Sequence, residues 1–397
     1  MPIKNIPIKI MPLKKLLLVG AGHAHIGLLR RLRGTPLINA DITLISEQPQ
    51  SIYSGMLPGW MAGHYILDDI RIDIAAQCKQ AGVHFIQQPI VKIDAKSQRV
   101  MTADDYDHSY EVVSLNTGAD TDMHWLNNAD TNNADTNNAD TNSADTNSVI
   151  AIRPLHSFVN QWSQVLATAQ RSAHYQLAII GAGAAAIELV MAAQVALQHI
   201  HPNHQVFLIC GDVLLAGFNQ KFRHRVIKQL NRLSIEVIYE RAIAYQNGTL
   251  ITERASLQQS FLMDAVIAAT GVTGAAWTAS TDIATVDNGF IAVNALQQSV
   301  SHNNVFAVGD VATRVDKDVA HSGVHAVHGG AVAADNLLTF MVDQNKPLQS
   351  YQPKNRTLYL LSCGDKYAIA SWGSVSLQGR WVWYLKRYID KRFVNAN

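Results

Sequence analysis

The stretch KKLLLVGAGHAH, residues 14–25, joins a short apolar run to a turn of small residues. Residues 14–19 have the length and composition of a buried strand, and residues 20–22 form the turn. A helix is predicted over 25–32 and a second strand over 41–45. Small residues at such a turn let the backbone approach a pyrophosphate on the N terminus of the helix. The stretch therefore predicts the opening of a βαβ unit that binds a dinucleotide.

The same pattern returns in mid-chain. A strand is predicted over 176–180, followed by the turn GAGAAA at 181–186. An alanine-rich helix then runs to about residue 198. A further strand is predicted over 205–210. The second loop ends in Ala186, where the first has the larger His25, and one chain thus carries two Rossmann-like units.

Composition excludes several other classes of protein. A chain of 397 residues with 48% hydrophobic and 16% charged residues can bury two or three cores. The net charge is +1 without a long basic tract, so we expect no nucleic-acid partner. Three cysteines far apart form no CxxC pair, which fits a reducing cytoplasm and argues against a dithiol centre or a disulfide framework. No stretch reaches the roughly 18 apolar residues that span a bilayer.

A tract over residues 127–148 repeats Asn-Asn-Ala-Asp-Thr with a period of five. A pentapeptide solenoid would need a large inward side chain in each coil, and the repeat offers only alanine and threonine. We therefore expect a flexible surface loop.

Three further segments are apolar strands that end in turns or in a carboxylate. Residues 110–118 end in Asn-Thr-Gly, residues 264–271 end in Ala-Thr-Gly, and residues 304–310 end in Gly-Asp. Asp310 could accept hydrogen bonds from ribityl hydroxyls. Glu47 stands near the position of an acidic residue that binds the adenosine ribose, although Ser46 occupies the end of the strand itself.

This order of motifs resembles the pyridine nucleotide-disulfide oxidoreductase superfamily over about residues 14–340. Within that superfamily, SIYSGMLPG at 51–59 and GRWVW at 379–383 resemble the branch near type II NADH dehydrogenases. More narrowly, they are similar to the flavoprotein module fused to selenophosphate synthetase in some bacteria, and the synthetase is absent here.

The resemblance implies an α/β chain with two Rossmann-like dinucleotide-binding domains of the glutathione-reductase-like FAD/NAD(P) fold. Residues 1–150 and 275–345 would bind FAD, residues 151–274 would bind NAD(P), and residues 346–397 would form a small cap. It also implies hydride transfer from NADH or NADPH to FAD, followed by electron transfer to a quinone or another small acceptor. A flavin-binding redox partner or sensor with little turnover is the alternative.

Roles follow from the resemblance for matching positions. Gly20 and Gly22 would meet the FAD pyrophosphate, the loop 54–58 would lie near the isoalloxazine, and Glu188 would help to hold the nicotinamide nucleotide. The expected cofactor-binding residues are Gly20, Gly22, His23, Ala24, Glu47, Ser54, Pro58, Thr117, Gly118, Gly181, Gly183, Ala186, Glu188, Thr270, Gly271, Gly309, Asp310 and His321.

Two departures from the family limit the choice of acceptor. Disulfide reductases use a cysteine pair and sulfide:quinone oxidoreductases rely on cysteines, and no pair is visible here. The type II dehydrogenases carry Ala-Gln-x-Ala-x-Gln after the Gly-Asp motif, whereas residues 322–327 read SGVHAV without either glutamine. The first departure disfavours thiol chemistry, and the second argues against a quinone.

Three histidines, His321, His325 and His328, are spaced to share one face of a helix. A metal site, a role in the flavin pocket and simple packing are the alternatives. We expect no metal, and we take His325 and His328 as candidate catalytic residues that supply a proton or a hydrogen bond to the flavin or the acceptor.

The segment 380–394 predicts an amphipathic helix. One arc carries Trp381, Tyr384, Leu385, Tyr388 and Ile389, and the other side carries Lys386, Arg387, Asp390 and Lys391. The apolar arc either docks on a membrane, such as the inner face of the cell membrane, or covers an apolar face of the protein. Whether the chain forms a homodimer stays open.

Overall fold

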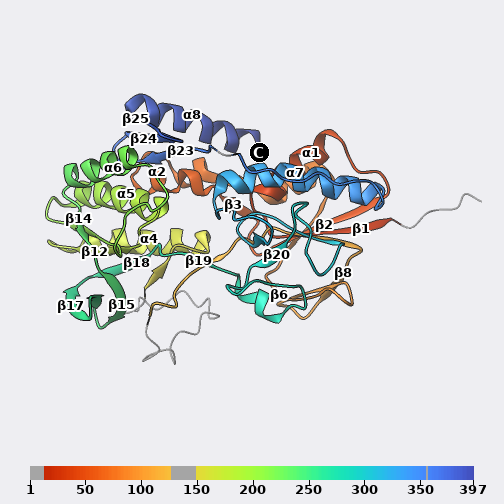
Figure 1. Cartoon of the computed structure of the whole chain (residues 1–397), viewed down its shortest axis with the longest axis horizontal. Coiled ribbons are helices and arrows are strands. Elements are labelled where there is room, and N and C mark those ends of the chain that lie inside the picture. Colours follow the sequence, from red (N-terminus) through yellow and green to blue (C-terminus); the bar gives the residue numbers. More distant parts are fainter. Residues whose placement is uncertain (1–12, 127–148, 355) are drawn as a thin grey trace, which may run out of the picture.

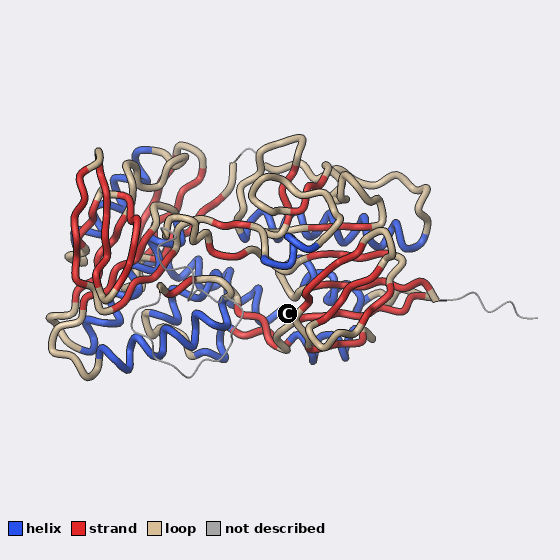
Figure 2. The backbone as a smooth tube through the Cα atoms, turned by 90° about the horizontal axis from the view of Figure 1, so that it is seen from below, coloured by secondary structure: helices blue, strands red, loops and turns tan. Residues whose placement is uncertain are grey.

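The computed structural model describes residues 13–126, 149–354 and 356–397, and the repeat tract lies outside these ranges. Two lobes, each built on a five-stranded parallel sheet, stand side by side, and Figures 1 and 2 show them from two directions. A C-terminal unit lies across the top of the view in Figure 1. The expected α/β class with two Rossmann-like cores is confirmed.

The sheet of the first lobe has the order β21-β9-β1-β2-β5. Its strands are β1 (Lys14–Val19), β2 (Ala40–Ser46), β5 (His84–Gln87), β9 (Val112–Leu115) and β21 (Val305–Ala307). The helices α1 (His23–Gly34), α3 (Ile74–Ala81) and α7 (Gly323–Val342) cover one face.

Side chains of β1 alternate between the two faces of this sheet. Leu16 and Leu18 pack against the three helices, whereas Leu17 and Val19 pack against a second layer of small sheets. A run of apolar residues is therefore buried on both faces. The second layer contains β6 (Ile90–Asp94), β7 (Arg99–Thr102), β8 (Asp107–Ser109), η4 (Ala276–Ser280), β20 (Ile291–Val293) and β22 (Ala312–Arg314).

The second lobe repeats this plan with the order β11-β18-β12-β13-β14. Its strands are β11 (Ile150–Ala151), β12 (Gln176–Ile180), β13 (Gln205–Ile209), β14 (Glu236–Ile238) and β18 (Ala265–Ala268). The helices α4 (Leu155–Ala169), α5 (Ala184–Ile200) and α6 (Gln220–Arg232) pack on one face. The opposite face meets the meander of β15 (Arg241–Gln246), β16 (Thr249–Arg254) and β17 (Leu257–Leu262).

A two-stranded ribbon and a short insertion complete the connections. The strands β10 (Asp120–Thr121) and β19 (Val272–Thr273) pair antiparallel between the lobes. The insertion after β2 contains β3 (Gln50–Ile52), η1 (Ser54–Met56), α2 (Leu57–Met61), η2 (Leu67–Ile70) and β4 (Arg71–Asp73). Its helix α2 packs against α5, so the insertion bridges from the first lobe to the second.

The C-terminal unit is a three-stranded antiparallel sheet followed by one helix. It consists of β23 (Leu358–Ser362), β24 (Ala368–Trp372), β25 (Val375–Gly379) and α8 (Arg380–Ala396). Val382 and Trp383 of α8 pack on Ala368 and Ala370 of β24. From there α8 extends toward α1 of the first lobe (Figure 1).

Candidate functional site

Each glycine loop closes against its own threonine-glycine turn. Gly20 has φ +86°, and a Cβ on it would lie 2.6 Å from the backbone of Asn116 and Thr117. In the second lobe a Cβ on Gly181 would lie 2.2 Å from the carbonyl oxygen of Ala269. A side chain cannot fit at either position, so the glycines allow loop and turn to form one surface at the carboxyl ends of the strands.

Asn116 joins three motifs of the first lobe. Its Oδ1 accepts hydrogen bonds from the backbone N–H groups of Ala24 and His25, at 3.1 and 3.2 Å. Its Nδ2 donates to the carbonyl oxygen of Val308 at 2.6 Å, directly before Gly309. Asn116 was not among the predicted site residues, although its place in the Asn-Thr-Gly turn was the available signal.

His25 occupies the position where many such loops have a third glycine. The side chain is buried and bridges the loop and the sheet: Nδ1 lies 2.6 Å from the carbonyl oxygen of Gly20, and Nε2 lies 2.8 Å from Ser114 Oγ in β9. The close contact between helix and strand is thus built from an imidazole in place of a glycine.

Asp310 and Arg153 form an ion pair beside the first loop, with 2.7 Å between Oδ2 and the guanidinium. The backbone N–H of Arg153 also donates to Thr121 Oγ1 in the interlobe ribbon. Glu47 follows β2 and lies 3.6 Å from His156 Nε2. Arg153 was missed in the sequence because it stands alone after β11, yet the fold places its cation between the two lobes.

The remaining first-lobe candidates lie in the turn after β9, in the 54–58 loop and at the start of α1. Thr117 Oγ1 accepts a hydrogen bond from Trp277 Nε1 at 3.3 Å, and Gly118 has φ +83°. Ser54 begins η1 and Pro58 is buried in α2. His23 is the first residue of α1 and contacts the ring of Tyr53, and burial lowers the pKa of its imidazole.

The second loop leads into α5, whose N-cap residue is Gly183, and no side chain caps the helix there. Ala186 is fully buried beside Gly181, which explains why a small residue is needed. Thr270 Oγ1 donates to the carbonyl oxygen of Asp122, and Gly271 O accepts from the N–H of the same residue. The two threonine-glycine turns are therefore linked through the interlobe ribbon.

Glu188 lies in the second turn of α5 and contacts the C-terminal sheet. Its Oε1 accepts the backbone N–H of Ser362 in β23 at 2.7 Å, and desolvation raises the pKa of its carboxyl group. The structure thus places Glu188 against the C-terminal sheet, and its role toward the nicotinamide nucleotide stays a prediction.

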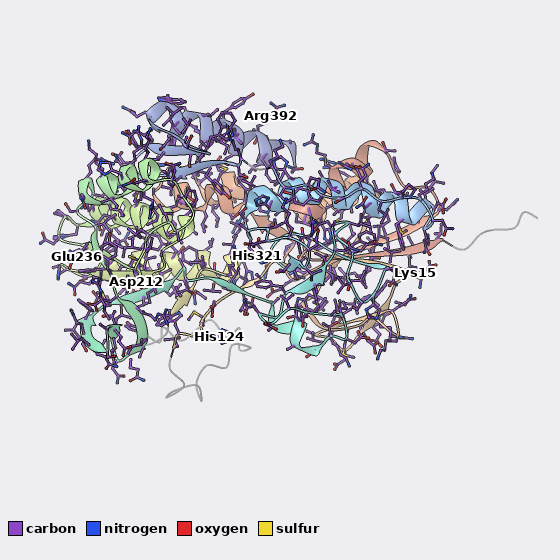
Figure 3. The ribbon with its side chains drawn as sticks, in the orientation of Figure 1. Lys15, His124, Asp212, Glu236, His321 and Arg392 are labelled. Atoms are coloured by element: carbon purple, nitrogen blue, oxygen red, sulfur yellow. The ribbon has the colours of Figure 1, made fainter. Side chains whose placement is uncertain are left out.

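The expectation of three histidines on one helical face is wrong, because α7 begins at Gly323 and His321 precedes it. His321 lies between the lobes in Figure 3, stacks on Phe290 and lies 3.1 Å from Thr313 Oγ1. His325 Nδ1 lies 2.9 Å from the hydroxyl of Tyr351, whereas His328 is exposed. No cluster of metal-ligating side chains occurs among the described residues.

Burial lowers the pKa of both His321 and His325, so both imidazoles are neutral at pH 7. The side chains of His321, His325 and Asp310 line one small cavity. The three residues therefore share a polar wall beside the Gly-Asp motif, and His328 is outside it.

These residues fit a dinucleotide at each loop. A Cβ built on Gly118 or Gly183 would meet nothing within 4 Å, so open space adjoins both loops. The carboxylate of Asp310 suits hydroxyl groups, the guanidinium of Arg153 suits a pyrophosphate, and the uncapped N terminus of α5 suits a second phosphate.

Relatives of the chain were found by sequence and by structure. Ferroptosis suppressor protein 1 of Taeniopygia guttata is 24% identical over 298 residues, which cover 71% of this chain and 70% of that protein. The protein of the same name from Mus musculus is 26% identical over 200 residues, covering 47% of this chain and 51% of that one.

Solved structures share the fold. NDH2 of Plasmodium falciparum, determined in complex with NADH, gives a TM-score of 0.79 at 12% identity and covers 96% of each chain. The sulfide:quinone oxidoreductase of Aquifex aeolicus gives a TM-score of 0.76 at 16% identity, covering 97% of this chain and 92% of that chain.

A family model described as pyridine nucleotide-disulphide oxidoreductase matches residues 14–330, from β1 into α7. This range contains both glycine loops, both threonine-glycine turns and the Gly-Asp motif. The match confirms the expected family and its cofactors, FAD and NADH or NADPH: the chain belongs to the pyridine nucleotide-disulphide oxidoreductase family.

Proposed function

We propose that this protein is an FAD-dependent NAD(P)H oxidoreductase of the type II NADH dehydrogenase kind, with a quinone or another small electrophile as acceptor. The observation that carries the proposal is the direct link between the two sites. Each glycine loop closes on its own turn, and the residues after the two turns pair as β10 and β19. Two dinucleotides bound at these loops would be held in one fixed relation, which hydride transfer requires.

Residues of the chain would chiefly bind and orient the cofactors. Asp310 would hold ribityl hydroxyls, Arg153 would face the pyrophosphate, and His321 would line the flavin pocket as a neutral imidazole. His325 is the better of the two candidate catalytic residues because it shares the cavity wall with Asp310, whereas His328 is exposed. Bound FAD would itself supply the hydride-accepting chemistry.

Thiol chemistry is disfavoured by the three cysteines. Cys78, Cys210 and Cys363 are all buried and unpaired. Burial raises the pKa of Cys78 to about 12 and that of Cys210 to about 11, so neither is a thiolate at neutral pH. An acceptor that takes electrons directly from flavin fits this chain better. The name of the Aquifex aeolicus protein includes a quinone, which supports that class in spite of the missing glutamines.

The outer surface of α8 supports attachment to an anionic membrane. Trp381, Tyr384, Leu385, Tyr388 and Ile389 are exposed, so this arc is available to a membrane, while α8 packs on the protein through its other side. The arc is flanked by basic residues, of which Arg380 and Arg392 are exposed. Aromatic and basic side chains together suit a headgroup layer.

Exposed apolar side chains of the neighbouring sheet, Leu358, Trp372, Val375 and Leu377, enlarge the same unit's apolar surface. Among the described residues no helix is long and apolar enough to cross a bilayer. The proposed attachment is therefore peripheral, through the C-terminal unit.

The test is steady-state oxidation of NADH and NADPH with a panel of acceptors: quinones, oxygen, ferricyanide and selenium compounds. Rapid turnover with one quinone or small electrophile supports the proposal. Slow turnover with every acceptor, together with stoichiometric FAD, would instead favour a redox partner or sensor.

A further inference from the structure

The helix α8 has an inner side that combines apolar packing with buried charge. Val382 and Trp383 lie on the C-terminal sheet, as described above. One and two turns farther along, Lys386 and Asp390 also face inward, with side chains that are 12% and 8% exposed. Both residues belong to the polar side predicted for this helix, opposite the apolar arc. Burying two charged groups is costly unless both find partners.

The partners are the 53–55 segment of the first lobe. Asp390 Oδ1 accepts a hydrogen bond from the hydroxyl of Tyr53 at 3.1 Å, and Asp390 Oδ2 lies 2.9 Å from Lys386 Nζ. Lys386 Nζ also donates to the carbonyl oxygen of Gly55 at 2.7 Å. The buried pair therefore fixes one short segment, which opens the loop that the family resemblance places near the isoalloxazine.

Aromatic contacts extend the connection to the first glycine loop. The ring of Phe393 stacks on Tyr53 with 4.8 Å between centroids and 24° between planes. The centroid of the His23 ring lies 5.5 Å from the ring centroids of both Tyr53 and Phe393. Because His23 directly follows Gly22, this cluster stands beside the position expected for the FAD pyrophosphate.

The last turn of α8 is fixed to the first lobe as well. The guanidinium of Arg33 in α1 donates to the carbonyl oxygen of Ala396 at 3.3 Å, and Gln77 of α3 donates to that of Asn397. The helix thus reaches from its own sheet to α1 and α3 of the first lobe.

We propose that residues 386–393 of α8 are a clamp that retains FAD, with Asp390 and Phe393 as its principal residues. The clamp holds Tyr53 and the 53–55 segment against His23, so the cofactor cannot leave until α8 releases them. The inference rests on the assignment of FAD to the first loop. A helix that served only to cap the protein would need apolar packing alone, whereas the contacts of Lys386, Asp390 and Phe393 converge on the 53–55 segment and on His23 at the start of α1.

The test is the rate at which FAD leaves the holoprotein after dilution, followed by the rise in free-flavin fluorescence. Asp390→Asn keeps the shape of the side chain but removes the charge that orients Tyr53 and Lys386. Phe393→Ala removes the stacked ring. We expect each change to accelerate release by about tenfold or more, the scale of a lost aromatic or charge-assisted contact. Tyr53→Phe removes only the hydroxyl and should give a smaller, few-fold increase.

The matched control is Tyr388→Ala, which truncates an aromatic ring on the exposed side of the same helix. It should release FAD at the wild-type rate. Should Phe393→Ala fail to fold, Tyr53→Phe and Asp390→Asn decide the question. If these inner-side variants all bind FAD tightly and release it at the wild-type rate, the clamp is wrong but the assignment of FAD to the first loop stands. A wild-type protein that binds no FAD overturns both the clamp and the cofactor assignment.

Discussion

The imidazole Nε2 of His25 lies 2.8 Å from Ser114 Oγ and ties helix α1 to strand β9. The other ring nitrogen lies 2.6 Å from the carbonyl oxygen of Gly20, to which it donates when it carries the proton. A neutral ring therefore satisfies both contacts, with Nδ1 as donor and Nε2 as acceptor. Burial favours that form, because it lowers the pKa of His25 to about 4.

Stability should consequently fall in acid. The folded-state pKa of His25 is depressed below the ordinary value of 6.5, so the unfolded chain binds the proton more readily. The neutral ring's contribution to the free energy of unfolding is fully present above pH 6.5 and is lost as the pH falls toward 4. The loss is about 2 to 3 kcal/mol near pH 4.5.

Urea unfolding of wild type and His25→Gln at pH 7 and 4.5 measures this loss of unfolding free energy. His25→Gln should lose less unfolding free energy than wild type between the two pH values. The control is His124→Gln, at an exposed histidine, which should lose as much as wild type. Equal losses in wild type and His25→Gln would contradict the assignment.

Gly22→Val should abolish FAD binding. A Cβ at this position would lie 2.4 Å from Asn116 Oδ1, the atom that accepts the N–H groups at the start of α1. The valine must displace Asn116 and with it the loop. The ratio of flavin to protein absorbance reports the loss. Gly27→Ala is the control, since a Cβ there meets nothing within 4 Å and its flavin content should be unchanged.

The nicotinamide preference should be weak or favour NADH. Strand β13 ends at Ile209, and the buried Cys210 replaces the usual acidic residue at its end. Asp212 is exposed two residues later, where its charge would repel a 2′-phosphate. We expect kcat/KM for NADH to equal or exceed that for NADPH, and Asp212→Asn to reduce the difference.

Glu236→Gln serves as the control for this comparison. Glu236 carries the same charge in the same lobe (Figure 3), but it begins β14 and pairs with Phe207, before the carboxyl end of β13. The ratio of kcat/KM for NADH to that for NADPH should be the same in Glu236→Gln as in wild type. A strong preference for NADPH would overturn this view of the second site.

Deletion of residues 127–148 with a short Gly-Ser bridge should leave flavin content and turnover unchanged. The flanking residues Leu126 and Val149 pack against the same apolar cluster of the second lobe, so a short bridge can join them. The repeat itself has little apolar surface to bury. Absorbance spectra and NADH oxidation rates of the shortened protein check this, and a chain that no longer folds would show that the repeat is structural.

Membrane attachment should depend on the outer side of α8. Replacing Trp381 and Tyr388 by serine should abolish co-sedimentation with vesicles containing phosphatidylglycerol, while flavin content stays normal because both side chains are exposed. Wild-type binding should weaken at high salt. Leu257→Ser, at an exposed apolar residue of β17, should bind as wild type. If the wild-type protein ignores these vesicles at low salt, the membrane hypothesis fails.

Local pattern was sufficient for the two nucleotide-binding units. The strands β1 and β12 have the predicted bounds, and α8 begins at the predicted Arg380. A buried parallel strand followed by a glycine turn leaves little choice of conformation, because only a residue without Cβ can pass so close to the neighbouring turn. The same local reasoning began the helix of the three histidines at His321. In the structure Ser322 still has an extended backbone, and the helix begins at Gly323.

Which residues meet across the site was decided by the tertiary structure. Three site residues gain their roles from partners far away in the sequence. Asn116 bonds to Val308, Arg153 pairs with Asp310, and Tyr53 bonds to Asp390. The helical periodicity of 380–394 separates an apolar arc from a polar side, but it does not predict which surface of the protein the helix packs against. That surface joins the sheet β23–β25 to the 53–55 segment, whose carbonyl and hydroxyl groups bury Lys386 and Asp390 of the polar side.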